Sequence, residues 1–222
     1  MKVCVLASGS KGNCTYIESG KSKILIDCGI SKKRAVECLN QIGVNPQEIS
    51  AIFVTHEHRD HIKGIGAFSR SFNVPVFAHN AIYQELLNKI GDISLQNSID
   101  FFDNDFYFKD LTVSPFAVPH DSINCMGFSF YSGGEKISVS TDLGSVSPQT
   151  LEKMAGSKIV VLESNHDIDL LRANPNYPTE LNSSTADCGI TENGLPNCFP
   201  EVLQSTKSHV WKTSELYPVL FL

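Results

Sequence analysis

Residues 56–61 of the chain read His56-Glu57-His58-Arg59-Asp60-His61. His56 and His58 stand at alternate positions of an extended segment, so their imidazoles can point the same way and bind one cation. Asp60 and His61 can then serve a second cation, because imidazole nitrogens and carboxylate oxygens are ligands that transition metals favour. The alternative is a solvated polar loop. We consider it weak, because so many ionisable side chains in one short segment are an unusual chance arrangement.

Strand-like and helix-like patterns alternate on both sides of these histidines. The apolar run over 51–54 predicts a buried strand that ends where the histidines begin. Between 31 and 42 the apolar residues fall at helical spacing, with Ser31 as the expected N-cap and Gly43 just past the end. We expect further helices over 62–71, 80–89 and 149–155, and strands over 3–7, 14–18, 23–27, 74–78, 106–108, 111–117, 127–131, 136–140 and 158–162. This alternation predicts an α/β fold.

Two residues elsewhere in the chain are candidates to complete the metal shells, since one short segment cannot fill them. His120 follows the strand expected over 111–117, and Asp142 follows the strand expected over 136–140. Each has an ordinary alternative, which is a surface loop position for His120 and a turn or helix cap for Asp142. Taken alone, each position is better explained by these alternatives. Their joint occurrence at strand ends, in an order that matches the family resemblance described below, favours metal ligands.

Several other positions carry weaker signals. Glu163 and His166 follow a buried-strand pattern and could orient a ligand imidazole, but a polar strand end is an equal alternative. His79 follows a strand and opens a helix, so we expect a cap or surface residue. The glycines and asparagine over 8–13 could bring N–H groups toward a phosphate. The segment lacks the Gly-Lys-Ser/Thr ending of a phosphate-binding loop, so we expect a tight turn.

Composition limits the classes of partner and compartment. The net charge of −6 argues against a broad electrostatic surface for nucleic acid, although a nuclease with bound cations or a local basic patch is still allowed. Seven cysteines, scattered singly and odd in number, suit a reducing cytoplasm better than a disulfide framework. No apolar stretch is long enough to span a bilayer, and the first residues do not form a secretory signal. We therefore expect a cytoplasmic protein without a membrane segment.

Four pieces of the sequence together resemble the metallo-β-lactamase superfamily. They are the H-x-H-x-D-H segment, the run Leu-Ile-Asp-Cys-Gly at 25–29, His120, and the run Ser-Thr-Asp at 140–142. Residues 7–14, Ala-Ser-Gly-Ser-Lys-Gly-Asn-Cys, and 162–167, Leu-Glu-Ser-Asn-His-Asp, resemble its bacterial YycJ/WalJ branch. The resemblance covers about residues 1–173. It implies a four-layer αβ/βα sandwich with a dinuclear site on one edge.

The resemblance also implies ligands, cofactors and a substrate. Two divalent cations, zinc or manganese, are the implied cofactors, and members of the branch are implied to be DNA-directed with 5′-to-3′ exonuclease activity. Asp60 could orient the water molecule that two adjacent cations make acidic enough to attack phosphorus or a carbonyl carbon. By the family's arrangement, His56, His58 and His120 would bind one ion, Asp60 and His61 the other, and Asp142 would bridge them.

After about residue 173 the sequence departs from the superfamily pattern. One more histidine, in a Gly-His-Leu-like context, is implied after the Glu163 segment, but the only later histidine, His209, lacks such neighbours. Half of the ten prolines fall in this part, and no long element is indicated there. We therefore divide the chain into a metallo-β-lactamase-like domain over 1–173 and an atypical segment over 174–222. This segment would be frame-shifted or poorly ordered, and the second metal site would then lack a ligand. Sequencing the gene tests the frameshift.

Three functions are compatible with these residues. The first is a dinuclear metal-dependent phosphodiesterase that acts on DNA. The second keeps the site but changes the substrate to a small phosphodiester, a thioester or a lactone, since one fold hosts many chemistries. The third is a metal-binding protein without catalytic activity. Metal stoichiometry separates the third function from the first two, and a substrate panel separates the first from the second.

Overall fold

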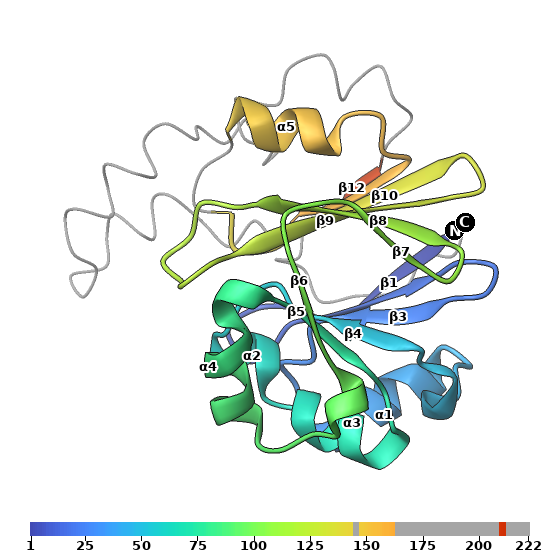
Figure 1. The fold of residues 1–222 in the computed structure, drawn as a ribbon. Helices are drawn as coiled ribbons and strands as arrows, with labels where there is room; N and C mark the ends of the chain where they lie inside the picture. The colour runs from blue at the N-terminus through green and yellow to red at the C-terminus, as the bar shows by residue number, and fades with distance from the viewer. Residues whose placement is uncertain (144–146, 163–208, 212–222) are drawn as a thin grey trace, which may run out of the picture.

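The computed structural model describes residues 1–143, 147–162 and 209–211, which form four layers (Figure 1). Two six-stranded sheets face each other in the middle. On the outer face of the first sheet lie α1 (Lys32–Gln41), α2 (Arg59–Ile62), α3 (Ile65–Phe72) and α4 (Asn80–Ile90), and on that of the second lies α5 (Pro148–Met154). This arrangement confirms the predicted αβ/βα sandwich.

Both sheets are mixed. In the first sheet β1 to β3 are antiparallel neighbours and β3 to β6 are parallel. In the second sheet β7 to β10 are antiparallel, and β11 and β12 add in parallel to β10. The first sheet has the order β1 (Lys2–Ala7), β2 (Cys14–Glu18), β3 (Lys23–Ile26), β4 (Ala51–Phe53), β5 (Val76–His79), β6 (Ser98–Phe101). The second has the order β12 (His209–Trp211), β11 (Ile159–Leu162), β10 (Glu135–Ser140), β9 (Met126–Ser132), β8 (Leu111–Ala117), β7 (Phe106–Phe108).

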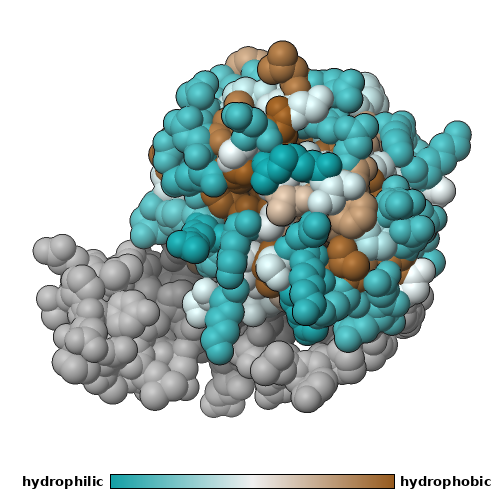
Figure 2. Space-filling view, turned by 90° about the horizontal axis from the view of Figure 1, so that it is seen from below, coloured by the Kyte–Doolittle hydropathy of each residue, from teal (hydrophilic) through white to brown (hydrophobic). Residues whose placement is uncertain are grey.

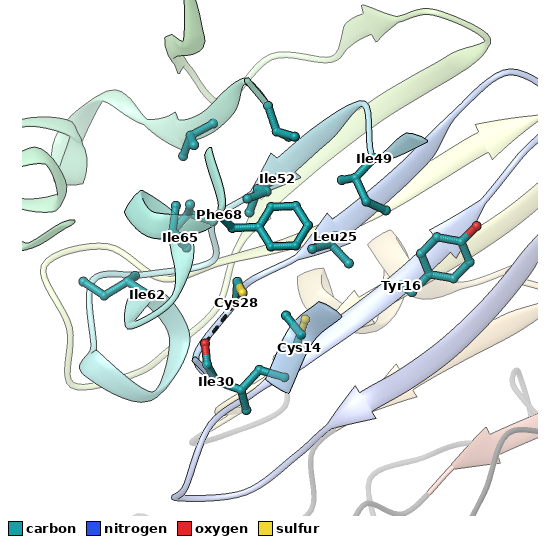
Figure 3. Close-up of a cluster of buried hydrophobic side chains, with 14 of the residues drawn as sticks. Cys14, Tyr16, Leu25, Cys28, Ile30, Ile49, Ile52, Ile62, Ile65 and Phe68 are labelled. Atoms are coloured by element: carbon teal, nitrogen blue, oxygen red, sulfur yellow. Dashed lines mark hydrogen bonds between the residues drawn. The ribbon is translucent and has the colours of Figure 1, made fainter. Parts of the chain in front are cut away.

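Each interface between layers is filled by its own hydrophobic core. Leu25, Ile52 and Phe68 belong to the core between the first sheet and its helices (Figure 3). Phe53 and Phe128 belong to the core between the two sheets, where their rings meet edge to face with centroids 5.8 Å apart. A smaller core under α5 contains Phe116, Met154, Val160 and Leu162.

Strand β4 explains why the run before the histidines is apolar at every position. Ile52 and Val54 pack toward the helices, whereas Ala51 and Phe53 pack toward the second sheet. A parallel strand covered on both faces needs apolar side chains in both directions. The strand is therefore fixed in place on both sides, and the residues that follow it start from a rigid position.

The helices follow the predicted pattern with one change. Ser31 caps α1, because its Oγ accepts a hydrogen bond from Arg34 N–H at 3.3 Å. The helix expected over 62–71 is interrupted at Gly64, so that α2 and α3 are separate. Gly64 N–H donates to Cys28 O at 2.7 Å, and a Cβ at Gly64 would lie 2.1 Å from Ile30 O. The close approach of this loop requires a glycine and divides the helix.

Some elements were not predicted from the sequence. Two short 3₁₀ helices, η1 (Pro46–Glu48) and η2 (Leu95–Asn97), and strand β6 gave no distinct pattern. Beyond residue 173, where no long element was indicated, the structure describes the three-residue strand β12 beside β11. The described helices are all too short or too polar to cross a membrane. Figure 2 shows that the face seen from below, on the side of α1 to α4, is mostly hydrophilic with small apolar patches.

Candidate metal centre

Five of the six predicted ligands come together at one edge of the sandwich, beyond the ends of β4, β8 and β10. The ring nitrogens of His56, His58 and His120 lie within 4.8 Å of one another, and so do the ligand atoms of His56, His61 and Asp142. His56 therefore belongs to both groups. Asp60 belongs to neither, but its Oδ2 lies 3.7 Å from His61 Nε2 at the border of the second group.

The donor set fits a shared cation. His56 Nε2 and Asp142 Oδ2 are buried and have no hydrogen-bond partner within the described part of the chain. Asp142 Oδ2 lies 2.7 Å from His61 Nε2 and 3.8 Å from His56 Nε2. A buried polar atom without a partner costs about 1–3 kcal/mol, so such atoms need a ligand. Two imidazole nitrogens and a carboxylate oxygen that converge in this way are suited to a zinc- or manganese-like ion.

One buried carboxylate orients two of the imidazoles. His61 Nδ1 and Thr55 Oγ1 donate to Asp27 Oδ2 over 2.7 Å and 2.8 Å. Thr55 Oγ1 also lies 2.9 Å from His56 Nδ1, from which it accepts a hydrogen bond. Both rings then have a protonated Nδ1, so Nε2 is the nitrogen of each ring that faces the site. Asp27 entered the sequence analysis only through the family resemblance, and the role of Thr55 was missed.

Asp27 and Asp142 share an uncommon backbone conformation. Their φ values are +59° and +51°, in the left-handed region. That region costs an L-residue roughly 1–2 kcal/mol, and short polar side chains tolerate it best. Residues with this conformation cluster at functional sites, although Asn73 and Lys109 adopt it in turns of this chain. Here it places one carboxylate behind His61 and the other beside His56 and His61.

The two inner histidines have opposite pKa shifts. Burial lowers the pKa of His56 to about 2, and the neighbouring His61 acts in the same direction. Burial also acts to lower the pKa of His61, but the Asp27 and Asp142 carboxylates outweigh it and raise the pKa to about 10. Burial acts to raise the pKa of Asp142, but His61, together with His56 and His120, outweighs it and lowers the pKa. His56 is therefore a neutral ligand, whereas a cation at His61 has to displace a proton.

Backbone hydrogen bonds to two loops fix the segment that carries Asp60 and His61. Asn13 N–H donates to Asp60 O at 2.7 Å, and Cys28 N–H donates to His61 O at 2.9 Å. The two loops are joined because Gly29 N–H donates to Asn13 O at 2.7 Å. A side chain cannot replace the hydrogen at Gly29, since a Cβ there would lie 1.4 Å from Asp60 O.

A second buried carboxylate holds the loop that carries His120. Glu57 Oε1 accepts a hydrogen bond from Ile123 N–H at 3.1 Å, and Lys89 of α4 donates to Glu57 O at 3.3 Å. The loop that Glu57 holds in this way brings His120 Nε2 to 3.2 Å from His58 Nδ1. Glu57 thus ties the histidine segment to the loop from the other sheet. Its sequence position between two histidines gave no sign of this role.

The weaker sequence signals have mixed outcomes. His79 caps α4 by accepting a hydrogen bond from Ala81 N–H at 3.2 Å, but it is buried and not a surface residue. Gly9 and Gly12 have positive φ, and Gly12 N–H donates to Gly9 O at 2.8 Å, which confirms the tight turn. The segment over 163–166 lies outside the described residues.

Comparison with known proteins agrees with this geometry. The model of the metallo-beta-lactamase superfamily matches residues 7–167. Exodeoxyribonuclease YycJ of Bacillus anthracis is 37% identical over 178 residues, which cover 80% of this chain and 67% of that protein. Exodeoxyribonuclease WalJ of Streptococcus pneumoniae serotype 2 (strain D39 / NCTC 7466) is 33% identical over 175 residues, which cover 78% of this chain and 65% of that protein. The chain thus spans about two thirds of the length of these relatives.

A solved structure supports the fold independently. Human tRNase Z, short form, superposes with a TM-score of 0.61 at 16% identity, covering 84% of this chain and 88% of that one. The superfamily match and the two relatives confirm the resemblance that the sequence motifs indicated. The chain belongs to the metallo-β-lactamase superfamily of metal-dependent hydrolases and is similar to its YycJ/WalJ branch.

Proposed function

We propose that this chain is a phosphodiesterase that degrades DNA from the 5′ end with two divalent cations, zinc or manganese. The observation that carries the proposal is the pair of ligand groups that share His56 at one edge of the sandwich. Both named relatives are exodeoxyribonucleases, which supports DNA as the substrate class. The net charge of −6 requires that any DNA-binding groove is local, so binding should weaken as salt rises.

The proposed ligand assignment uses all six predicted residues. Asp142 is the residue that would contact both cations, because its Oδ2 approaches the Nε2 atoms of both His56 and His61. Asp60 would complete the coordination of the second cation, because its Oδ2 lies at the border of the group formed by His56, His61 and Asp142. In full, His56, His58 and His120 would hold one cation, Asp60 and His61 would hold the other, and Asp142 would contact both.

Residues of the chain have separate roles in the proposed reaction. Two divalent cations, when bound, would polarise a phosphoryl oxygen and lower the pKa of a water molecule toward neutrality. Asp60 is the residue we assign to orient this water and accept its proton, since its side chain is 34% exposed beside the buried His61. Asp27 and Thr55 keep the Nε2 lone pairs of His61 and His56 directed at the site.

Two proposals concern the whole chain. The division into a catalytic domain over 1–173 and an atypical segment over 174–222 rests on composition and on the implied distal histidine. A cytoplasmic location is supported by the cysteines, because the five in the described residues are buried free thiols. Reading the gene in the other frames downstream of residue 177 tests the division.

A substrate panel tests the function. The metal-loaded chain should release mononucleotides from the 5′ end of a labelled oligonucleotide. Asp60→Asn should lower kcat by about 100-fold or more, as expected for loss of a general base, while Asp100→Asn, an exposed control, should not. Cleavage of a small ester but not of DNA would support the second function instead. One bound cation and no turnover of any ester would support the inactive metal-binding protein.

A further inference from the structure

Asn13 is a buried amide whose orientation is fixed by the backbone around it. It is only 4% exposed. Its N–H donates to Asp60 O and its carbonyl accepts from Gly29 N–H, each over 2.7 Å. Its Oδ1 accepts from Gly9 N–H at 2.8 Å. Because a backbone donor occupies Oδ1, the other end of the amide, Nδ2, must be the end that faces the histidines.

The Nδ2 donor is directed at the metal-facing nitrogen of His61. The distance between Asn13 Nδ2 and His61 Nε2 is 2.9 Å, and Asp142 Oδ2 lies 2.7 Å from the same nitrogen. An N–H group of Asn13 can use the Nε2 lone pair only while the His61 ring is neutral. A cation bound to His61 would take that lone pair. The Asn13 N–H would then be a buried donor without an acceptor, which costs about 1–3 kcal/mol unless a new acceptor arrives.

An anionic oxygen of the substrate is the acceptor that fits this position. An amide N–H next to a cation is repelled by the ion but is attracted to an oxygen anion that the ion has bound. Donors fixed in advance at such positions stabilise negative charge without reorganisation. Resting on the function proposed above, we propose that Asn13 Nδ2 donates a hydrogen bond to a non-bridging oxygen of the phosphate bound at the site.

Binding of inorganic phosphate to the manganese-loaded full chain, measured by calorimetry, tests this role without catalysis. Asn13→Leu should bind phosphate about 10- to 100-fold more weakly, as expected for loss of a charge-assisted hydrogen bond. It should still bind two manganese ions, because Asn13 is not a ligand. Asn97→Leu is the matched control: Asn97 is also buried, but its amide donates to Asn73 Oδ1 at 2.7 Å. This control should bind phosphate normally.

A second variant, Asn13→Asp, distinguishes loss of the hydrogen-bond donor from misfolding of Asn13→Leu. The aspartate keeps the acceptor for Gly9 N–H, replaces the donor with an oxygen and adds negative charge. We expect it to bind manganese more tightly and phosphate more weakly than the original chain. Such opposite changes cannot come from a general loss of structure.

Each outcome separates the two proposals. Phosphate affinity that is unchanged in Asn13→Leu overturns the role of Asn13 and leaves the proposed function intact. Loss of manganese binding in Asn13→Leu also overturns this role, because the amide would then be needed to position the metal ligands. If the original chain binds phosphate through Asn13 but cleaves no DNA, the role of Asn13 stands and DNA as the substrate fails.

Discussion

Asp27 does not face the cations, but it fixes the position of the Nδ1 proton on two of the ligand imidazoles. Its Oδ2 accepts from His61 Nδ1 directly and reaches His56 through Thr55. In Asp27→Asn, an amide N–H would face His61 Nδ1. The imidazole proton would move to Nε2 and block the cation. We expect metal content to fall from two ions per chain to one, measured by mass spectrometry.

Asn tolerates the left-handed backbone of position 27 as Asp does, so the variant should fold. Nitrogen NMR of the imidazoles should show His61 as the Nε2–H tautomer. Asp100→Asn, on the exposed side of β6, serves as the control and should keep both ions. Two ions retained in Asp27→Asn would contradict the orienting role.

The pKa of His61 predicts a pH dependence for cation binding. The group is protonated below about pH 10 in the absence of metal, because the charges of Asp27 and Asp142 outweigh burial. A cation at Nε2 therefore displaces a proton at neutral pH. Below pH 10, the affinity for this cation should increase roughly tenfold for each unit by which the pH rises. Calorimetry in buffers of different ionisation heat should detect about one proton released on filling the second site. The absence of proton release at pH 7 would contradict a second site whose cation displaces a proton from His61.

At the level of secondary structure, the placement of α2 depends on Gly29 and Gly64, which let the chain approach closely at the two ends of this helix. Gly29→Ala would put a Cβ 1.4 Å from Asp60 O, a contact that the backbone cannot absorb. We expect the free energy of unfolding to fall by about 2 kcal/mol or more and Asp60 and His61 to be displaced. Urea unfolding and metal content measure the two effects. Gly20→Ala is the control, since its Cβ would meet Asp110 Oδ2 at an ordinary 3.5 Å; equal destabilisation of both variants would contradict this account.

The pattern of apolar residues predicted most elements but not the contacts between them. The run over 51–54 showed a buried strand because both of its faces are covered, and Ser31 marked its helix by its capping chemistry. Strand β6 was missed because its residues alternate between polar and apolar over only four positions, whereas the aromatic run of β7 is a strong strand signal. The break between α2 and α3 was missed because it depends on the approach of the loop after β3, which helical periodicity cannot report.

At the scale of the whole molecule, Asp110 links the two sheets at the turn between β7 and β8. Its carboxylate accepts hydrogen bonds from Ser19 and Ser22, in the turn between β2 and β3, and from Lys21 N–H. Burial acts to raise its pKa, but these donors outweigh it and lower the pKa to about 2. The stabilisation is present above the unfolded pKa, near 3.8, and is lost as pH falls through about 2.

We therefore expect Asp110→Asn to be less stable than the original chain at pH 6, with a difference that shrinks as the pH falls from about 4 to about 2. Urea unfolding over this pH range measures it. Asp100→Asn is the control and should show no such convergence. A stability difference that does not change with pH would mean that the carboxylate charge does not join the sheets.

The candidate site could be predicted in part because its ligands are local or stand at strand ends. The spacing of His56, His58 and His61 is a sequence property, and His120 and Asp142 stand at strand ends in the order that the family resemblance implies. Thr55, Glu57 and the amide of Asn13 could not be found in this way. Their roles come from hydrogen bonds between segments that are distant in the sequence, and each residue type is common in ordinary loops.

The number of metal ions bound per chain decides whether the site is dinuclear. The measurement uses mass spectrometry on the freshly purified chain, with His58→Ala and Asp142→Ala prepared beside it. We expect two divalent ions in the original chain. We expect fewer in His58→Ala, which loses a ligand of one group, and fewer in Asp142→Ala, which loses the proposed bridge between both. A single ion in the original chain, or two ions retained in both variants, would contradict a dinuclear centre built on these residues.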